Sequence, residues 1–432
     1  MTIVELFSGI GSQAKALQNI GYDIKVAGTC EWDIHAFIAY DAIHNSPDIN
    51  EHIKSMSKKD LLDKLQNFIL SNNGKEPMDF KQLKTYSVES LQRIYSGIFR
   101  SKNFVDVSSL DGRKLPNNID ILTYTFPCQD LSNAGAFHGY NKGIDKDSGS
   151  RSSLLWQVGR ILQEMKAGGK KMPRFLLMEN VPSLLSERHF GNFKMWISDL
   201  EKLGFISHYY QLNAADFGLP QNRLRLLMIS VYVGKKERRK RRVEKYFDRV
   251  SPESIVADYR NSEFYQQIKI DELFRTDYSN EKLLSEALEC CPNDTVSRQK
   301  IWIENPQLVL PENIVNPAYK MIRTITTKQD RNPNSGNLYF DKGGKGKSIF
   351  RYITPRECLL FMGFTDGDYE NIVKNNPEIH KGSLLFSRDK IIRMGGNSIP
   401  VKLLEGIFWQ IKQIDETVLK HNGCAQQRNK KL

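Results

Sequence analysis

Residues 119–129 read Ile119-Asp120-Ile121-Leu122-Thr123-Tyr124-Thr125-Phe126-Pro127-Cys128-Gln129, an apolar run that ends in a proline and a cysteine. A short apolar run of this kind predicts a buried strand of a parallel sheet. Parallel sheets carry their chemistry beyond the carboxyl ends of the strands, and Pro127 fixes the turn just before Cys128. The stretch therefore predicts an α/β fold with a thiol facing the crevice at that edge.

Two later segments bring further polar side chains to the same predicted edge. The apolar run 174–178 leads into Glu179-Asn180-Val181, and Gln221-Asn222-Arg223-Leu224-Arg225 precedes the apolar run 226–229. Each pattern has an ordinary explanation on its own. A lone cysteine is usually a small buried residue, a Glu-Asn pair can start a helix, and an Arg-x-Arg pair is most often a solvated strand face. Because the patterns occur together and in order, we expect one thiol, one carboxylate and two guanidinium groups to line one edge.

This set of side chains suits the methylation of cytosine at carbon 5. Carbon 5 is a poor nucleophile until a thiolate adds at carbon 6, and Cys128 is the predicted nucleophile. Glu179, held partly neutral by burial, is predicted to supply a proton or a hydrogen bond at N3. Arg223 and Arg225 are predicted to hold the cytosine O2 and a flanking phosphate, and to favour the thiolate. The reaction requires no metal.

The N-terminal residues predict a site for a second substrate. A short strand is followed by the tight turn Ser8-Gly9-Ile10-Gly11-Ser12-Gln13-Ala14, which opens a helix. The turn matches the dinucleotide-binding pattern, and Glu31 stands 20 residues after Gly11, where an acid binds a ribose hydroxyl. That pattern alone also fits NAD. Phe7, Trp32 and the thiol half of the site favour S-adenosylmethionine, whose adenine can lie against aromatic rings.

These motifs resemble those of the DNA (cytosine-5) methyltransferases, and the resemblance covers nearly the whole chain. The string Phe126-Pro127-Cys128-Gln129-Asp130-Leu131-Ser132 is also similar to bacterial CpG methyltransferases. The segments that resemble the family's motifs, in the family's order, are 7–11, 31–32, 106–107, 127–129, 151–155, 179–181, 221–225, 351–358 and 396–400.

The resemblance implies a fold, an activity and a set of site residues. The implied fold is α/β, a Rossmann-like S-adenosylmethionine-dependent methyltransferase domain with a smaller, loop-rich target-recognition domain. The implied enzyme is a sequence-specific DNA (cytosine-5-)-methyltransferase of restriction-modification type, which forms a covalent Cys128 adduct with a flipped-out cytosine. The implied cofactor-binding residues are Phe7, Gly9, Gly11, Glu31, Trp32, Asp106, Val107, Pro127, Leu154 and Asn397.

Two alternatives stay open beside this activity. A tRNA-methylating relative would carry the same catalytic set, although a large variable domain favours sequence-specific DNA reading. A catalytically idle DNA-binding module is disfavoured because every catalytic residue type is present. The sequence does not reveal the recognition site.

The chain departs from the family pattern in three places. Ser12 and Thr125 stand where glycine is usual, and a small side chain there costs at most about 1 kcal/mol if the backbone angles permit it. Residues about 50–102 form an insertion with apolar positions at helical spacing in 58–70 and in 90–99. We expect two surface helices with a structural role, and DNA contact is the less favoured reading.

Changes in periodicity and charge along the sequence divide the chain into two predicted domains. Residues 1–233 and 390–432 are expected to form the cofactor-binding and catalytic domain, which the helix 401–414 completes. Residues 234–389, with poor periodicity, are expected to form the target-recognition domain. The charge run 235–242 reads as a linker, as a phosphate-contacting entry to that domain, or as a solvated surface. The segment 343–347 predicts a flexible basic loop over the DNA backbone, and a disordered surface loop is the alternative.

Composition agrees with a polyanionic partner. The 432 residues carry a formal net charge of +12, which favours double-stranded DNA, although basic proteins that bind nothing are common. No stretch approaches the ~20 apolar residues of a membrane span, and we expect the first residues to begin a strand and not an export signal. The six cysteines show no Cys-x-x-Cys spacing. We expect a cytoplasmic monomer that binds no membrane and no metal, with or without a cognate restriction endonuclease acting separately.

Overall fold

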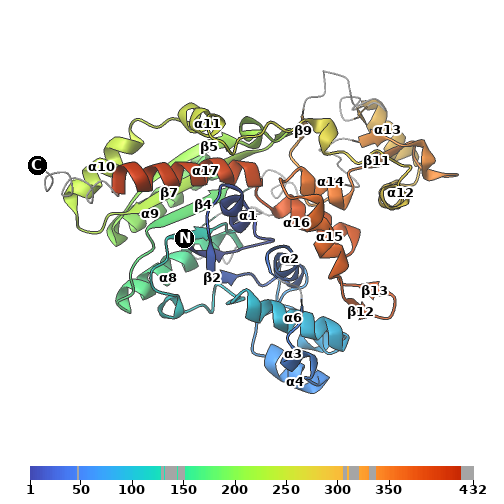
Figure 1. The fold of residues 1–432 in the computed structure, drawn as a ribbon, viewed down its shortest axis with the longest axis horizontal. Helices are drawn as coiled ribbons and strands as arrows, with labels where there is room; N and C mark the ends of the chain where they lie inside the picture. The colour runs from blue at the N-terminus through green and yellow to red at the C-terminus, as the bar shows by residue number, and fades with distance from the viewer. Residues whose placement is uncertain are drawn as a thin grey trace, which may run out of the picture.

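A six-stranded sheet with helices on both faces forms the centre of the structure, a computed structural model (Figure 1). The residues that it describes are 1–45, 48–127, 131, 144, 151–304, 309–310, 321–329 and 337–419. The strands lie in the order β2-β1-β3-β4-β7-β5. Their bounds are β1 Thr2–Leu6, β2 Lys25–Cys30, β3 Ile121–Tyr124, β4 Phe175–Asn180, β5 Phe205–Asn213 and β7 Leu224–Tyr232.

The sheet separates two apolar cores, because successive residues of a strand point to opposite faces. Ile3 and Ile121 belong to one core, and their neighbours Val4 and Leu122 belong to the other. The helices that pack on the first face are α1 (Ser12–Asn19), α2 (Ile34–His44) and α17 (Val401–Gln413). The helices on the second face are α8 (Leu155–Ala167) and α9 (Glu187–Leu203). This is the α/β architecture that the sequence predicts.

The direction of β7 decides which residues meet at the site. β1, β2, β3 and β4 run parallel, but β7 runs antiparallel to β4, with Glu179 opposite Leu227 and Asn180 opposite Leu226. The first residues of β7 therefore lie beside the last residues of β4. The short strand β6 (Gln221–Asn222) leads into this start and pairs with β9 (Ile322–Arg323).

The insertion forms a small helical layer below α2. Its helices are α3 (Glu51–Lys54), α4 (Lys58–Leu65), α5 (Phe80–Leu83) and α6 (Val88–Arg100). α4 and α6 match the two helices that the sequence predicts. Their apolar faces, including Leu61, Leu65, Leu91 and Ile94, are fully buried in the first core. The insertion is therefore an integral part of the packed domain.

The two helices after β7 pack on the catalytic domain. These are α10 (Glu237–Phe247) and α11 (Pro252–Arg260), and their buried residues Val243, Phe247, Ile255 and Tyr259 join the first core. Figure 1 shows both helices beside α17, at the opposite end of the molecule from α12 and α13. The segment 235–242 is thus neither a linker nor an entry to the smaller domain, and we propose that this domain begins near residue 268.

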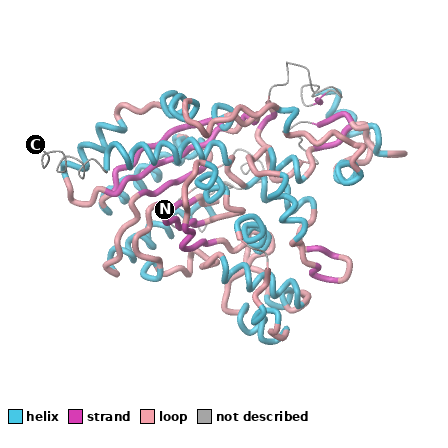
Figure 2. The backbone as a smooth tube through the Cα atoms, in the orientation of Figure 1, coloured by secondary structure: helices cyan, strands magenta, loops and turns pink. Residues whose placement is uncertain are grey.

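The smaller domain consists of short elements connected by loops (Figure 2). Ile270, Leu273, Ile322 and Leu338 contribute to its own apolar core. Its elements and those that return the chain to the sheet are α12 Glu281–Glu289, α13 Val296–Glu304, β8 Val309–Leu310, β10 Asn337–Tyr339, β11 Phe350–Tyr352, α14 Pro355–Leu360, α15 Asp366–Lys374, β12 Glu378–His380, β13 Ser383–Leu384 and α16 Arg388–Asn397. The chain then enters α17, which begins at the predicted residue 401.

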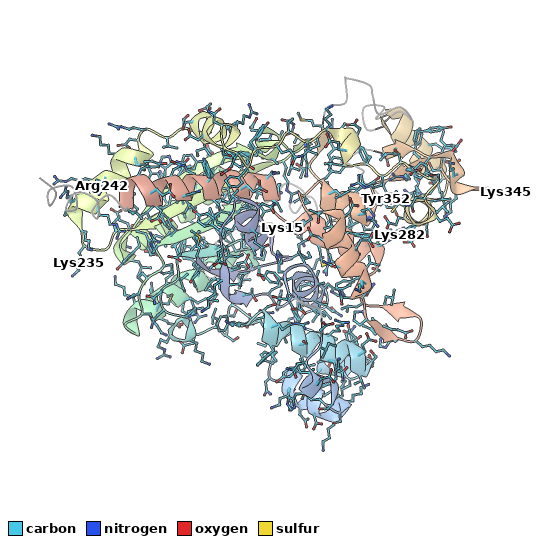
Figure 3. All side chains as sticks on the ribbon, viewed as in Figure 1. Lys15, Lys235, Arg242, Lys282, Lys345 and Tyr352 are labelled. Atoms are coloured by element: carbon cyan, nitrogen blue, oxygen red, sulfur yellow. The ribbon has the colours of Figure 1, made fainter. Side chains whose placement is uncertain are left out.

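The glycine-rich segment 343–347 is a turn, held by a neighbouring segment. The Asp294 N–H donates to the Gly346 carbonyl at 2.9 Å, and Lys347 Nζ donates to Asn293 Oδ1 at 2.9 Å. Lys345 lies at the tip of the turn, at the outer end of the smaller domain (Figure 3). The flexibility of this turn and its contact with DNA both stay predictions.

Candidate functional site

Hydrogen bonds from several segments anchor the three residues that precede Cys128. Asn180 Nδ2 at the end of β4 donates to the Phe126 carbonyl at 3.1 Å, and Ser152 Oγ donates to the Pro127 carbonyl at 2.6 Å. Thr125 Oγ1 donates to the Phe7 carbonyl at 2.9 Å, which gives this departure from glycine a structural role. Cys128 itself lies outside the described residues. Its position directly after the anchored Pro127 follows from the sequence, and its role stays a prediction.

The N-terminal turn has the backbone conformations that its glycines allow. Phe7, Gly9 and Gly11 have φ angles of 58°, 54° and 83°. A Cβ on Gly11 would come within 2.2 Å of His44 Nε2 and 2.7 Å of the Tyr40 ring, so only glycine fits. Ser12 begins α1 without a positive φ, so glycine is not required there.

A buried acid that sequence reasoning missed supports this turn from below. Glu5 in β1 is fully buried, and its two oxygens accept hydrogen bonds from the Ala14 N–H at 3.1 Å and from the Tyr40 hydroxyl at 2.6 Å. Burial raises the pKa of Glu5 to about 7. The signal in the sequence was a single acid inside the apolar run Ile3-Val4-Glu5-Leu6.

Glu31 closes the cofactor end of the site. One carboxylate oxygen accepts from the Gly9 N–H at 3.1 Å, and the other accepts from the Asp33 N–H at 2.9 Å. Each oxygen keeps a further lone pair, which a ribose hydroxyl can use. Burial, followed by the nearby Asp33 charge, raises the pKa of Glu31 to about 7. Trp32 is half-buried beside it.

Asp106 stands opposite on a loop with an unusual backbone. Val105 has a φ of 66°, which is strained for a β-branched residue, and it directs the chain into Asp106-Val107. The Ser108 N–H donates to Asp106 Oδ1 at 3.0 Å and leaves Oδ2 for another donor. Strain of this kind persists where a surrounding site holds it.

Arg393 joins the insertion to the cofactor site, which sequence reasoning also missed. Its Nη2 donates to Asp33 Oδ2 at 2.8 Å, and its Nη1 bonds to the Asn73 carbonyl. Lys390 Nζ donates to the Asn72 carbonyl at 2.9 Å. These contacts hold the loop that carries Gly74, which lines the pocket. The partners stand about 320 to 360 positions apart, so spacing offered no signal.

Glu179 and Arg225 form a buried ion pair at the other end of the site. Arg225 Nε lies 3.0 Å from Glu179 Oε1, and each side chain is 12% exposed. Burial raises the pKa of Glu179, while the positive charges of Arg225 and Arg223 oppose the rise. A carboxyl group in this position can change protonation as charge develops on a bound ring.

Arg223 binds main-chain carbonyls, whereas the sequence predicts that it holds the cytosine O2 or a flanking phosphate. Its Nη1 donates to the Ile325 carbonyl at 2.7 Å, and its Nη2 donates to the carbonyls of Gly396 and Ser398 at 2.9 and 2.8 Å. Only 2% of the residue is exposed. Since both terminal nitrogens bind main-chain carbonyls, the structure places Arg223 as a clamp between β7, the smaller domain and the chain after α16.

A single cavity of about 250 Å³ joins the two ends of the site. Gly11 is the one predicted cofactor residue that does not line it, because it supports the turn from behind. Predicted residues that line the cavity are Phe7, Gly9, Glu31, Trp32, Asp106, Val107, Pro127, Leu154, Asn397, Glu179, Arg223 and Arg225. Further lining residues, which the prediction lacked, include Ser8, Ile10, Asp33, Gly74, Val105 and Ser398.

The described part of the chain shows neither a metal site nor a membrane span. Within it, no group of three or more His, Cys, Asp or Glu residues could hold a metal ion. None of the described helices is long and apolar enough to cross a membrane.

The amino-acid sequence matches a known family over most of its length. Residues 1–71 and 84–413 match the family described as C-5 cytosine-specific DNA methylase. The chain is 31% identical over 425 residues to the orphan methyltransferase M.SssI of Spiroplasma monobiae, covering 95% of this chain and 97% of that protein. It is 30% identical over 417 residues to the type II methyltransferase M2.ScrFI of Lactococcus lactis subsp. cremoris, covering 95% of this chain and 99% of that protein.

Solved structures agree with the fold. The S. pombe Dnmt2 methyltransferase superposes with a TM-score of 0.53 at 14% identity, over 96% of this chain and 98% of its own. The methyltransferase EhMeth of Entamoeba histolytica gives a TM-score of 0.51 at 12% identity, over 96% of this chain and 98% of its own. Together with the family match over residues 1–71 and 84–413, the relatives show that this chain belongs to the C-5 cytosine-specific DNA methylase family and is a DNA (cytosine-5-)-methyltransferase.

Proposed function

We propose that the protein transfers a methyl group from S-adenosylmethionine to carbon 5 of a flipped-out cytosine in duplex DNA. The observation that carries the proposal is the single cavity, which has an acid and aromatic rings at one end and the Glu179–Arg225 pair at the other. Pro127 lines the same cavity and precedes Cys128. Two substrates bound at the two ends would meet beside the thiol.

The cofactor end fits S-adenosylmethionine by the chemistry of its donors and acceptors. Glu31 offers free lone pairs to a ribose diol, Asp106 Oδ2 suits an adenine amino group, and Phe7 and Trp32 offer apolar faces. Leu154 and Asn397 add walls from two other segments. The bound cofactor supplies an electrophilic methyl group.

The chain's own residues would prepare the cytosine. The Cys128 thiolate would add to carbon 6, and the electron pair of the 5,6 double bond would make carbon 5 nucleophilic. Glu179 would donate a proton or a hydrogen bond at N3, where charge accumulates. Arg225 orients that carboxyl group and can bind the cytosine O2. After methylation, a water molecule would accept the carbon 5 proton, the electron pair of that C–H bond would re-form the 5,6 double bond, and the bond between carbon 6 and sulfur would break to release the Cys128 thiolate.

The target base would have to leave the double helix to react. Glu179 is 9% exposed and sits inside a walled cavity, which a stacked cytosine cannot enter. Rotation of the nucleotide out of the stack removes this obstacle at a cost of a few kcal/mol.

Sequence reading is assigned to the smaller domain, which begins near residue 268. Exchange of residues 268–353 for the counterpart of a relative with another specificity should redirect methylation while Cys128 and Glu179 stay essential. Bisulfite sequencing of the product shows which cytosines are modified. A chimera that still modifies the original site would place recognition elsewhere, with the insertion at 50–102 as the first candidate.

We further propose a role in a restriction-modification system. The name of M2.ScrFI is that of a type II methyltransferase, and its similarity covers 95% of this chain. Deletion of the gene should then leave host DNA sensitive to an endonuclease in extracts of the same cells. Host DNA that stays intact in those extracts would argue for an enzyme without a partner nuclease, in line with the orphan relative M.SssI.

A methyl-transfer assay tests the proposed activity. Cofactor with a labelled methyl group is incubated with the protein and either duplex DNA or tRNA. We expect label in DNA, stable to base hydrolysis as 5-methylcytosine. Label in tRNA alone would make the protein a tRNA methyltransferase, and DNA binding without label would make it an idle binding module.

A further inference from the structure

The segment 235–245 carries a dense cluster of positively charged residues. It holds eight lysines and arginines and two glutamates, so these eleven residues carry six of the twelve net positive charges of the chain. Most of the segment is helix α10. The catalytic proposal gives this charge no role.

The position of α10 separates it from the reactive cavity. Glu179 pairs with Leu227 of β7, and the strand runs on from there for five residues, about 17 Å, to Tyr232 before the chain reaches α10. Figure 3 shows Lys235 and Arg242 at one end of the molecule and Lys345 of the smaller domain at the other. DNA that fills the space between the cavity and the smaller domain would therefore leave α10 uncovered.

The helix presents its basic residues outward in one stripe. Val243 and Phe247 anchor the inner face in the core. Arg238, Arg241 and Lys245, three and four positions apart, are exposed and lie on the opposite face. Such like-charged neighbours repel one another, and a helix that keeps them without a partner loses stability by a small amount.

Few acids neutralise this face within the described residues. The two ion pairs that involve α10 both use Lys240, which lies 3.4 Å from Glu201 and 3.9 Å from Glu244. Arg242 Nη2 donates to the Thr417 carbonyl at 3.3 Å and keeps its charge. Burial is the main cause that lowers the pKa of Arg239; the positive charges of Arg174 and Arg242 lower it further, and Asp415 opposes them.

The last residues of the sequence are also basic. The helix η8 (Ile414–Leu419) packs beside α10, and the following residues 420–432 add four lysines and arginines and no acid. Their structure lies outside the described residues.

We propose that the exposed face of α10 binds the phosphate backbone of a second DNA segment while the cavity side holds the target. We name this surface the distal basic face and define it by Lys235, Lys236, Arg238, Arg241 and Lys245. The inference rests on the proposed action on duplex DNA, because that substrate supplies a second segment at high local concentration. Contacts to phosphates are independent of sequence, so this face would hold any duplex.

A bridging assay tests the distal basic face. A duplex with the target sequence is fixed to a surface and loaded with the protein, and a labelled duplex without the target is added. The wild-type protein should capture the second duplex, with affinity that falls steeply as salt rises. The triple variant Arg238→Gln, Arg241→Gln, Lys245→Gln should bind the second duplex about tenfold or more weakly, since glutamine keeps the helix but removes three charges.

A matched control carries the same charge change elsewhere. Lys59, Lys64 and Lys81 are exposed residues of the insertion, and their change to glutamine also removes three charges. This variant should bridge as the wild type does. Equal losses in both variants would reduce the effect to overall charge and overturn the proposal, as would bridging by the α10 variant at the wild-type level.

Two further measurements separate this inference from the catalytic proposal. Single-turnover methylation of a short target duplex should be the same in the wild type and the α10 variant, so an inactive wild type would count against the proposed function alone. Vesicles of phosphatidylserine and phosphatidylcholine test another polyanion. Binding of the wild type to these vesicles in preference to DNA, lost in the α10 variant, would assign the face to a membrane and overturn the DNA proposal.

Discussion

Arginines gather at both ends of the central sheet, but their surroundings differ. At the cavity end, Arg223 is buried and the Arg225 side chain is only 12% exposed, and each is bound to a carbonyl or a carboxylate at 2.7 to 3.0 Å. At the α10 end, Arg238 and Arg241 are exposed and take part in no ion pair among the described residues. Both ends carry several arginines, but only at the cavity end do bonded partners fix the positions of the guanidinium groups.

The difference separates two uses of positive charge. A buried guanidinium has its partners fixed by the fold, so it can orient one carboxyl group or one loop. An exposed one is screened by salt and attracts any polyanion within about 10 Å. Residues at the cavity end should therefore control rate and stability, whereas those at the α10 end should control salt-dependent binding.

The largest effect is expected at Cys128. Cys128→Ser or Cys128→Ala should lower methylation by about 10³-fold or more, because the covalent route needs a thiolate. Binding of S-adenosylmethionine, measured by calorimetry, should be unchanged. Duplexes that contain 5-fluorocytosine should trap a covalent complex with the wild type. A serine variant with wild-type turnover would contradict the covalent mechanism. The cavity end would then no longer be distinguished from the α10 end by this catalytic role.

A smaller loss of rate is expected at Glu179. Glu179→Gln should lower the turnover number about 10²-fold and change DNA affinity much less, because its interaction strengthens only as the ring gains charge. Single-turnover rates and binding titrations on the same duplex give the two values. Equal losses in rate and affinity would make Glu179 a binding residue only.

Arg223 and Arg225 should differ although they stand two positions apart. Arg223→Met removes three hydrogen bonds to carbonyls, so the free energy of unfolding should fall by about 3 kcal/mol. Arg225→Met leaves Glu179 without its ion-pair partner, so the turnover number should fall with a smaller change in stability. Denaturant unfolding and turnover of both variants provide the test. A stable Arg223 variant would disprove the clamp.

The smallest effect concerns pH and the cofactor. Because the pKa of Glu31 is raised to about 7, the carboxyl group is mostly protonated at pH 6 and mostly ionised at pH 8. Only the ionised form accepts hydrogen bonds at both oxygens, so affinity for S-adenosylmethionine should rise by about tenfold between these values. Glu31→Gln cannot titrate and should flatten the profile. A wild-type affinity that falls as pH rises would contradict the assignment.

In the insertion, the periodicity of apolar residues predicts helices but not their distant contacts. Apolar spacing in 58–70 and 90–99 predicted helices, and α4 and α6 lie there. The same spacing could not reveal that the loop between them reaches the cofactor site. That contact depends on Arg393, about 320 positions away from Asn73, and no local pattern encodes such a partner.

The start of the smaller domain illustrates a failure of a different kind. The many charges of 235–242 suggested a change of domain, because charge dominates the local composition. Two apolar residues, Val243 and Phe247, decide the outcome, since their burial fastens α10 to the catalytic core. Charge on the exposed face of a helix carries no information about what its other face covers.

The sequence by itself determined the α/β fold and the ordered motifs that identify the family. It also determined nearly all the predicted residues that line the cavity, because strand ends and tight turns are encoded locally. Only the tertiary structure decided that β7 runs antiparallel, which brings Arg225 to Glu179. It also assigned Arg223 to three carbonyls and Glu5 to the underside of the cofactor turn. The reason is that a buried polar group takes its role from partners that folding brings from distant parts of the chain.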